Sequence, residues 1–171
     1  VFGGTVFNLL SRTMEVFFIS SISGLGDTGR YAIGDFVSRF LEVPQRSMAA
    51  ITVPLLASHW KNKEYGRIQE LYTKSSAALL ISGLLIFGII WLNVDNFILF
   101  LPGQFGSPHV KYVILILGIG KLIDLGTGIN TQIIQTSNFW KFDFYTNIFY
   151  TLISIPLNYF LIHRYGMTGA A

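Results

Sequence analysis

Four ionisable residues are set into the apolar stretch of residues 30–60: Asp35, Arg39, Glu42 and Arg46. Their spacing of four, three and four residues places them within roughly 60° of one another on an α-helical wheel. The other faces of this helix are apolar, so only one narrow edge is charged. A charged group near the middle of a bilayer costs about 2.5–3.5 kcal/mol on insertion scales, so it normally faces a partner or water. The pattern predicts a helix in lipid that keeps its charged edge on a wet or paired surface.

Three other apolar stretches carry comparable rows of polar residues. The rows are Asn8, Arg12 and Glu15 in residues 3–22; Lys121, Asp124, Gly128, Gln132 and Gln135 in 110–135; and Asn147, Thr151, Ser154 and Asn158 in 144–163. Arg12 and Glu15 can pair at i, i+3, which would equally suit an ion pair that locks two helices. The uncharged row is equally compatible with polar contacts between helices. Because hiding so many polar groups in lipid is unfavourable, we expect the rows to converge on a hydrated cavity or a densely paired interface.

The charges within these rows balance. Arg12, Arg39, Arg46 and Lys121 stand against Glu15, Asp35, Glu42 and Asp124. An excess of basic groups would favour an anionic cargo, but this tally has none, so the residues alone do not select a phosphate. Glu15, Asp35 and Asp124 can serve as ion-coupling groups or as partners of the bases, whereas Glu42, between two arginines, is expected to be structural.

The elements that must position these rows are apolar spans. We expect them at about residues 3–22, 31–57, 75–94, 110–135 and 144–163, with residues 166–171 opening a further span. Charged residues are only 12% of the chain, about half the usual share of roughly 25%, and the mean hydropathy is +0.53. Residues 75–94 carry no charge and have the length that crosses a ~30 Å hydrocarbon core. The sequence predicts an all-α integral membrane protein, a multi-span helix bundle in which residues 1–171 form one fragment of a longer chain.

The connections between spans carry further expectations. Residues 24–29 are expected to form a glycine turn, and Pro44 is expected to kink the second span. Residues 58–74 are expected to form a polar link, and glycines of the fourth span are expected to permit close helix packing or local unwinding. Five basic residues lie on the side of the 58–74 link and three on the other side, which places that link in the cytoplasm.

Several classes of function lack the residues they need. The G-x-G-x-x-G pattern at residues 24–29 follows a long apolar helix rather than a strand, so it does not predict a nucleotide site. The chain contains no Cys, and its three His residues lie at separate predicted helix ends without metal-ligand spacing. The basic residues do not gather in one patch, as a nucleic-acid-binding surface requires. We therefore expect no enzyme activity, no cofactor or metal, and no nucleic-acid partner.

Several short motifs lie between residue 24 and the end of the given sequence. They are YAI after a glycine turn (residues 31–33), a Pro in mid-helix at Pro44, PLLAS at residues 54–58, a short basic loop, and the terminal RYGMTGAA. In these motifs the chain resembles bacterial polysaccharide flippases of the O-antigen type, which belong to the multidrug/oligosaccharidyl-lipid/polysaccharide exporter superfamily.

The resemblance implies the second half of a protein of about 12–14 helices, here helices seven to eleven and the start of twelve. It implies transport of undecaprenyl-diphosphate-linked oligosaccharide across the bacterial inner membrane for lipopolysaccharide or other surface-polysaccharide synthesis, by alternating access. It assigns Arg12, Arg39, Arg46 and Lys121 to the substrate path. Expected partners are the lipid-linked oligosaccharide, membrane lipids, the remaining helices of the protein and a glycan polymerase.

Two other functions remain open from the sequence. A multidrug or cation antiporter of the same superfamily would have a lumen richer in carboxylates and aromatic residues. A membrane glycan polymerase or ligase would need a large external loop, whereas the longest one expected here, residues 95–109, is mostly apolar.

Overall fold

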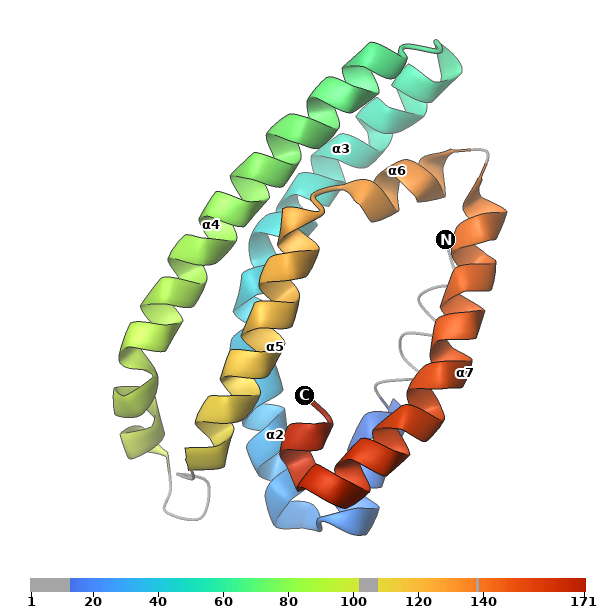
Figure 1. The fold of residues 1–171 in the computed structure, drawn as a ribbon. Helices are drawn as coiled ribbons and strands as arrows, with labels where there is room; N and C mark the ends of the chain where they lie inside the picture. Colours follow the sequence, from blue (N-terminus) through green and yellow to red (C-terminus); the bar gives the residue numbers. More distant parts are fainter. Residues whose placement is uncertain (1–12, 102–107, 138) are drawn as a thin grey trace.

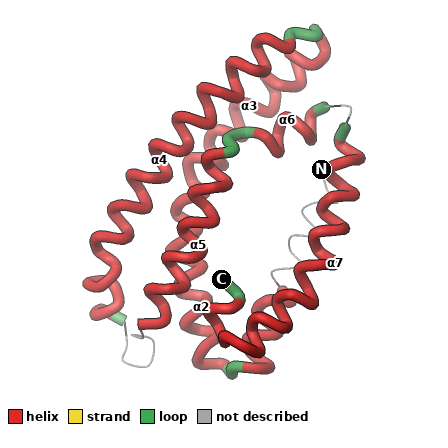
Figure 2. The backbone as a smooth tube through the Cα atoms, in the orientation of Figure 1, coloured by secondary structure: helices red, strands yellow, loops and turns green. Residues whose placement is uncertain are grey.

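The computed structural model describes residues 13–101, 108–137 and 139–171, and the regular elements in these ranges are all helical (Figure 1, Figure 2). In chain order they are the helix Thr13–Ile22, α2 (Leu25–Ser38), the 3₁₀ helix η1 (Arg39–Glu42), α3 (Val43–Lys61), α4 (Tyr65–Phe100), α5 (Pro108–Gly126), α6 (Asn130–Thr136), α7 (Trp140–Tyr165) and the 3₁₀ helix η2 (Gly166–Gly169). The predicted all-α class is confirmed.

Helix α5 packs against α2 and against α4, while α3 and α4 form an antiparallel hairpin whose closed end extends past the other helices (Figure 1). Glycines allow this close approach. A Cβ on Gly34 of α2 would lie 2.6 Å from Val113 Cγ1 of α5, and one on Gly118 of α5 would overlap the ring of Phe87 of α4. The predicted packing role is confirmed for Gly118, whereas Gly120 faces open space.

The second predicted span is interrupted rather than continuous. Helix α2 begins at Leu25, so the turn expected over residues 24–29 is reduced to Gly24, whose φ of +87° suits a residue without a side chain. The 3₁₀ helix η1 then separates α2 from α3, and Pro44 lies in the first turn of α3. A proline fits there because it has no N–H to donate and the first turn leaves those donors unpaired.

The link predicted over residues 58–74 is mostly helical. Helix α3 runs to Lys61 and α4 starts at Tyr65, so only residues 62–64 form the connection. The prediction of a long polar link was wrong because residues 65–74 form the amphipathic first part of α4. Glu70 stabilises this part of the helix by accepting an i, i+4 hydrogen bond from Lys74 at 2.8 Å.

The fourth predicted span is also broken. Helices α5 and α6 meet at an angle of 53°, and Gly128 between them has a φ of +66°. The Ser76 hydroxyl of α4 donates a hydrogen bond to the Gly126 carbonyl, which satisfies a backbone acceptor that the break leaves without its helical partner. The local unwinding expected at these glycines is therefore present, and the single span 110–135 is replaced by two helices.

Helix α4 is the element best suited to crossing a membrane. It has 36 residues and contains an 18-residue window with a mean hydropathy of 2.3, of which 17% is buried inside the molecule. The bent pair α5–α6 passes the same test only if it is counted as one span. Ile81, Leu85, Ile89 and Leu92 lie at helical spacing on one side of α4 and are 61–82% exposed. The described chain thus offers one or two spans by length and composition, with an apolar outer face that has no covering protein.

Candidate functional site

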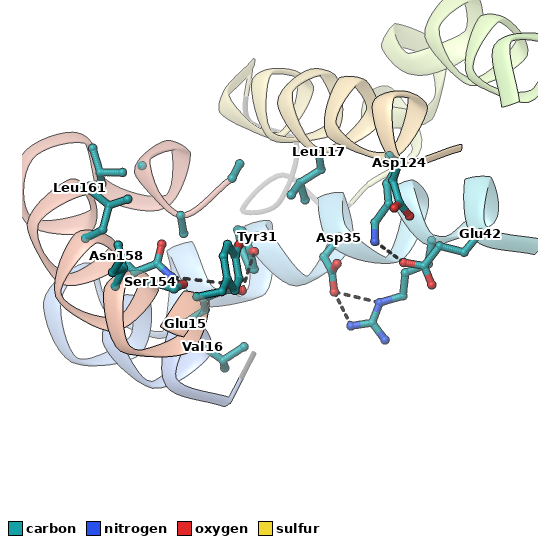
Figure 3. Close-up of a pocket in the computed structure, with 18 residues that line it drawn as sticks. Glu15, Val16, Tyr31, Asp35, Glu42, Leu117, Asp124, Ser154, Asn158 and Leu161 are labelled. Atoms are coloured by element: carbon teal, nitrogen blue, oxygen red, sulfur yellow. Dashed lines mark hydrogen bonds and ion pairs between the residues drawn. The ribbon is translucent and has the colours of Figure 1, made fainter. Parts of the chain in front are cut away.

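Polar and charged side chains from four α-helices and the 3₁₀ helix η1 line one cavity of about 900 Å³ (Figure 3). Its polar and ionisable lining residues are Glu15, Tyr31, Asp35, Arg39, Glu42, Lys121, Asp124, Tyr150, Ser154 and Asn158. Apolar side chains such as Leu117 and Leu161 complete the wall. Some members of each of the four predicted rows therefore meet at one place, which lowers the cost of keeping them in an apolar molecule.

The first of two polar groups in this cavity is ionic. Arg39 donates from Nε to Asp35 Oδ2 at 2.9 Å and also from Nη2 to the same oxygen. Lys121 Nζ lies 2.5 Å from Glu42 Oε1 and joins α5 to η1. We call Asp35, Arg39, Glu42, Lys121 and Asp124 the ionic end of the cavity.

Asp124 differs from the other carboxylates of the ionic end. It lies one helical turn after Lys121 on α5, and its Oδ2 accepts a hydrogen bond of 3.2 Å from Gln45 Nε2 of α3. Among the residues that the structure describes, Asp124 has no ion pair. It is therefore the carboxylate of this end that is most accessible to a cation or a cargo group.

The second polar group links three helices through Glu15. Tyr31 of α2 donates its hydroxyl to Glu15 Oε2 at 3.5 Å, and Asn158 of α7 donates from Nδ2 to Glu15 Oε1 at 3.4 Å. Asn158 also donates to Ser154 Oγ at 3.1 Å. We call Glu15, Tyr31, Tyr150, Ser154 and Asn158 the Glu15 end of the cavity. Figure 3 shows Glu15, Ser154 and Asn158 apart from Glu42 and Asp124 of the ionic end.

The 3₁₀ helix η1 explains why Asp35, Arg39 and Glu42 line the cavity whereas Arg46 does not. Each 3₁₀ residue advances about 120° around the axis instead of 100°, so four such residues turn the following helix by about 80° relative to a continuous α-helix. Asp35, Arg39 and Glu42 remain on the cavity, but Arg46 lies beyond the turn and is not among the lining residues. Its guanidinium pairs with Glu42 Oε2 at 2.7 Å and its side chain is 68% exposed.

The remaining sequence-predicted residues lie elsewhere. Asn8 and Arg12 fall outside the described residues. Asn147 and Thr151 bond to carbonyls one turn earlier in α7, as polar residues within a helix often do. Gln132 lies on α6 beyond the break, and its buried Oε1 accepts no hydrogen bond from the described part of the chain. Asn147, Thr151 and Gln132 do not line the cavity.

Sequence reasoning missed three residues of the site. Tyr31 precedes Asp35 by four residues, and Tyr150 precedes Ser154 by four, so helical spacing alone would have placed both on the polar faces. Gln45 could not be found in this way because its contact with Asp124 depends on how α3 crosses α5. Within the described residues no group of three or more His, Cys, Asp or Glu side chains could hold a metal ion.

Comparison of the chain with protein-family models, with curated proteins and with solved structures gave no match.

Proposed function

We propose that this chain is part of a multi-span membrane transporter that flips a lipid-linked oligosaccharide across the bacterial inner membrane. In this proposal the lined cavity is the substrate path, and two halves of the protein expose it to each side in turn. The observation that carries the proposal is the convergence of ionisable residues from separate helices on one cavity in a molecule with an apolar exterior.

The apolar exterior supports a lipid environment. Soluble proteins rarely expose contiguous apolar patches larger than a few hundred Å². Here large hydrophobic side chains are exposed along both α4 and α7, including Leu85, Leu92, Phe149 and Leu152. Lipid tails cover such a surface without cost, so the charged residues are left to face the interior.

The cavity has the size and the groups that a diphosphate-linked sugar needs. Its volume lies within the range of about 300–1,000 Å³ that small-molecule sites occupy. Arg39 uses Nε and Nη2 on Asp35, and its Nη1 donates to no other described residue. The Lys121 ammonium has three N–H donors and contacts one described carboxylate, that of Glu42. Both cations therefore keep donors for phosphate oxygens, which accept charge-assisted hydrogen bonds.

The export of surface glycan tests this proposal. We expect Arg39→Ala and Lys121→Ala to reduce export by about tenfold or more, because a hydrogen bond to a charged group contributes about 1.5–3 kcal/mol. Arg67→Ala is the matched control, since it removes the same charge from a side chain that is 70% exposed and lies outside the cavity. Membrane levels must be equal in all variants, and normal export in both cavity variants rejects the proposal.

A second function, exchange of cations or cationic drugs, is favoured by one observation. Four carboxylates line the cavity against two cations, and a surplus of carboxylates attracts positive cargo. This function predicts that Asp124→Asn lowers resistance to cationic dyes and leaves surface glycan unchanged. The flippase instead predicts that Arg39→Ala lowers surface glycan and leaves resistance to cationic dyes unchanged.

A further inference from the structure

The closed end of the α3–α4 hairpin is basic and extends past the other helices (Figure 1). Residues 61–74 contain four Lys or Arg residues and two Glu residues, which leaves a net charge of +2. Lys61 and Lys63 are exposed, and neither forms an ion pair with a residue that the structure describes. We call Lys61, Lys63 and Lys74 the lysine end of the hairpin.

The two carboxylates of this segment are already occupied. Glu64 Oε2 lies 2.6 Å from His59 Nδ1. Glu70 accepts a hydrogen bond of 2.8 Å from Lys74 and lies 3.8 Å from Arg67, so two cations share one carboxylate. An ammonium group has three N–H donors, and that of Lys74 bonds to Glu70 alone among the described residues while its side chain is 74% exposed. The lysine end therefore keeps positive charge and donors for an anionic partner.

The position of Lys74 around α4 indicates which partner this is. One narrow face of α4 carries Lys74 together with three exposed apolar residues, Ile81, Leu85 and Leu92. The four positions fall within about 40° of one another at 100° per residue. The uncharged residues 75–94 have the length of a ~30 Å hydrocarbon core, which places Lys74 at its boundary. Because helical side chains tilt toward the N-terminus, Lys74 is directed out of the apolar layer toward the lipid phosphates.

The backbone of Lys63 supplies an independent indication. Helix α3 ends with a hydrogen bond from the Lys63 N–H to the Trp60 carbonyl at 3.2 Å and one from the Glu64 N–H to the His59 carbonyl at 2.9 Å. This pair is the Schellman motif, in which the residue after the C-cap is left-handed and is usually Gly. Lys63 has this conformation, with a φ of +57°, although a side chain makes it unfavourable. A charged residue at a strained backbone position indicates a function for its side chain.

We propose that the lysine end binds the headgroups of anionic phospholipids and concentrates these lipids around this end of α4. Basic clusters next to the end of a membrane span are typical of anionic-lipid recognition. Lys74 contacts the phosphate layer directly, whereas Lys61 and Lys63 act on it over the Debye length of about 8 Å. An acidic soluble protein would also match the charge, but it would not require Lys74 to lie on the same face as the exposed apolar residues.

Fluorescence quenching by spin-labelled lipids tests the proposal on the full-length protein in phosphatidylcholine nanodiscs. A neutral dye is attached through Ala78→Cys, an exposed position one turn after Lys74 on the same side of α4. The quencher is phosphatidylglycerol, which is anionic, or phosphatidylcholine, which has no net charge, each labelled on the acyl chain near the headgroup. We expect the anionic quencher to be enriched near the dye by about fivefold or more over the neutral one.

A dye at Leu92→Cys is the matched control. Leu92 lies on the same face at the other end of the span, where Lys111 donates to both carboxylate oxygens of Asp95 at 2.7 and 2.8 Å. The two lipids should quench that dye equally. An anionic preference of the same size at both dye positions would overturn the proposal, because the enrichment would not depend on the lysine end.

Two variants separate lipid binding from folding. Lys74→Gln should reduce the anionic enrichment at Ala78→Cys about fivefold. Lys63→Gly should reduce it by about twofold, since Lys63 lies farther from the phosphates, and should raise Tm because Gly relieves the left-handed strain. A residue with only a structural role would not change stability and enrichment in opposite directions. Equal quenching by the two lipids in the parent protein, or unchanged enrichment in both variants, overturns the proposal.

This inference rests on the membrane setting of the proposed function but not on its cargo, and the two fail in different ways. If neither lipid quenches the dye at Ala78→Cys or at Leu92→Cys, α4 does not contact lipid and both are rejected. If the anionic preference follows the lysine end while Arg39→Ala and Lys121→Ala export normally, the flippase is rejected and the lipid site stands. If export is lost in those two variants and the lipids quench equally, the flippase stands and the lipid site is rejected.

Discussion

The contact between Gly34 of α2 and Val113 of α5 fixes how the two halves of the ionic end meet. Gly34 immediately precedes Asp35, and α5 carries Lys121, so the distance between α2 and α5 sets how closely Lys121 approaches Glu42 and the local Asp35–Arg39 pair. A Cβ at residue 34 would lie 2.6 Å from Val113 Cγ1 and 3.1 Å from Val113 Cβ. Val113 is fully buried and branched at Cβ, so it has little freedom to move away.

We predict that Gly34→Ala destabilises the protein. Overpacking of a well-packed core costs about 1–3 kcal/mol, and Ala gains back about 1 kcal/mol over Gly from its helix propensity. The matched control is Gly88→Ala in α4, where a Cβ meets nothing within 4 Å, so it keeps the propensity gain and has no clash. The two variants should therefore differ by about 1–3 kcal/mol, which corresponds to about 2–12 °C in Tm for a chain of this size.

Thermal unfolding of the two variants in the same detergent measures this difference. A double variant separates the clash from other causes, because Val113→Ala removes Cγ1, the nearest atom at 2.6 Å, and leaves Cβ at 3.1 Å. We expect Gly34→Ala to cost much less in the Val113→Ala background than in the wild type. The packing argument is refuted if Gly34→Ala is as stable as Gly88→Ala, or if its effect is the same with and without the Val113 methyl groups.

Three other perturbations have a clear expected direction. The hydrogen bond from Lys74 lowers the pKa of Glu70 below its ordinary value of 4.5. This pair therefore stabilises the folded chain above about pH 4.5, and the stabilisation is lost as pH falls through the pKa of the folded state. Glu70→Gln should flatten the decline of Tm at acidic pH. Gly128→Ala should be strongly destabilising, since a left-handed backbone costs an L-residue about 1–2 kcal/mol and the new Cβ would lie 2.9 Å from the α4 backbone. Lys121→Met should cost about 1–3 kcal/mol because it leaves the half-buried Glu42 carboxylate without its partner on α5.

Each of these predictions has a result that contradicts it. For Glu70, the same acid limb of the Tm curve in wild type and Glu70→Gln would show that the contact with Lys74 does not form in solution. For the break between α5 and α6, Gly120→Ala is the control because that position is open, and equal stability of the two glycine variants would argue against a tight turn. For Lys121, recovery of stability in the Lys121→Met, Glu42→Leu double variant is expected, and no recovery would place the cost elsewhere.

Periodicity within one helix predicted a large part of the site. Asp35, Arg39 and Glu42 share one face in the sequence and share the cavity in the structure, and Lys121 with Asp124 does so on α5. These residues are close in the chain, so an angle of 100° per residue is sufficient to group them. The convergence of rows from separate helices was predicted from the energetic cost of burying charge, and no sequence motif indicated it.

The errors fall where local geometry depends on distant contacts. Arg46 was placed on the same face as Arg39 because a continuous helix was assumed, and the 3₁₀ turn of η1 changes the phase. Gln132 was grouped with Lys121 for the same reason, although the 53° bend separates α6 from α5. Glycines show that a helix can unwind, but only the contact of Gly128 with Ser76 on α4 determines where it does so.

The central claim is that polar residues of separate helices face one water-filled interior while the apolar faces meet lipid. The chain contains no cysteine, so single cysteines can be introduced and treated with a membrane-impermeant charged thiol reagent, which reacts with the thiolate that forms in water. Asp35→Cys, Asp124→Cys and Ser154→Cys should be modified rapidly, whereas Leu85→Cys and Leu92→Cys on the outer face of α4 should react far more slowly. Rapid modification of the two leucine positions together with protection of the three cavity positions would contradict the account.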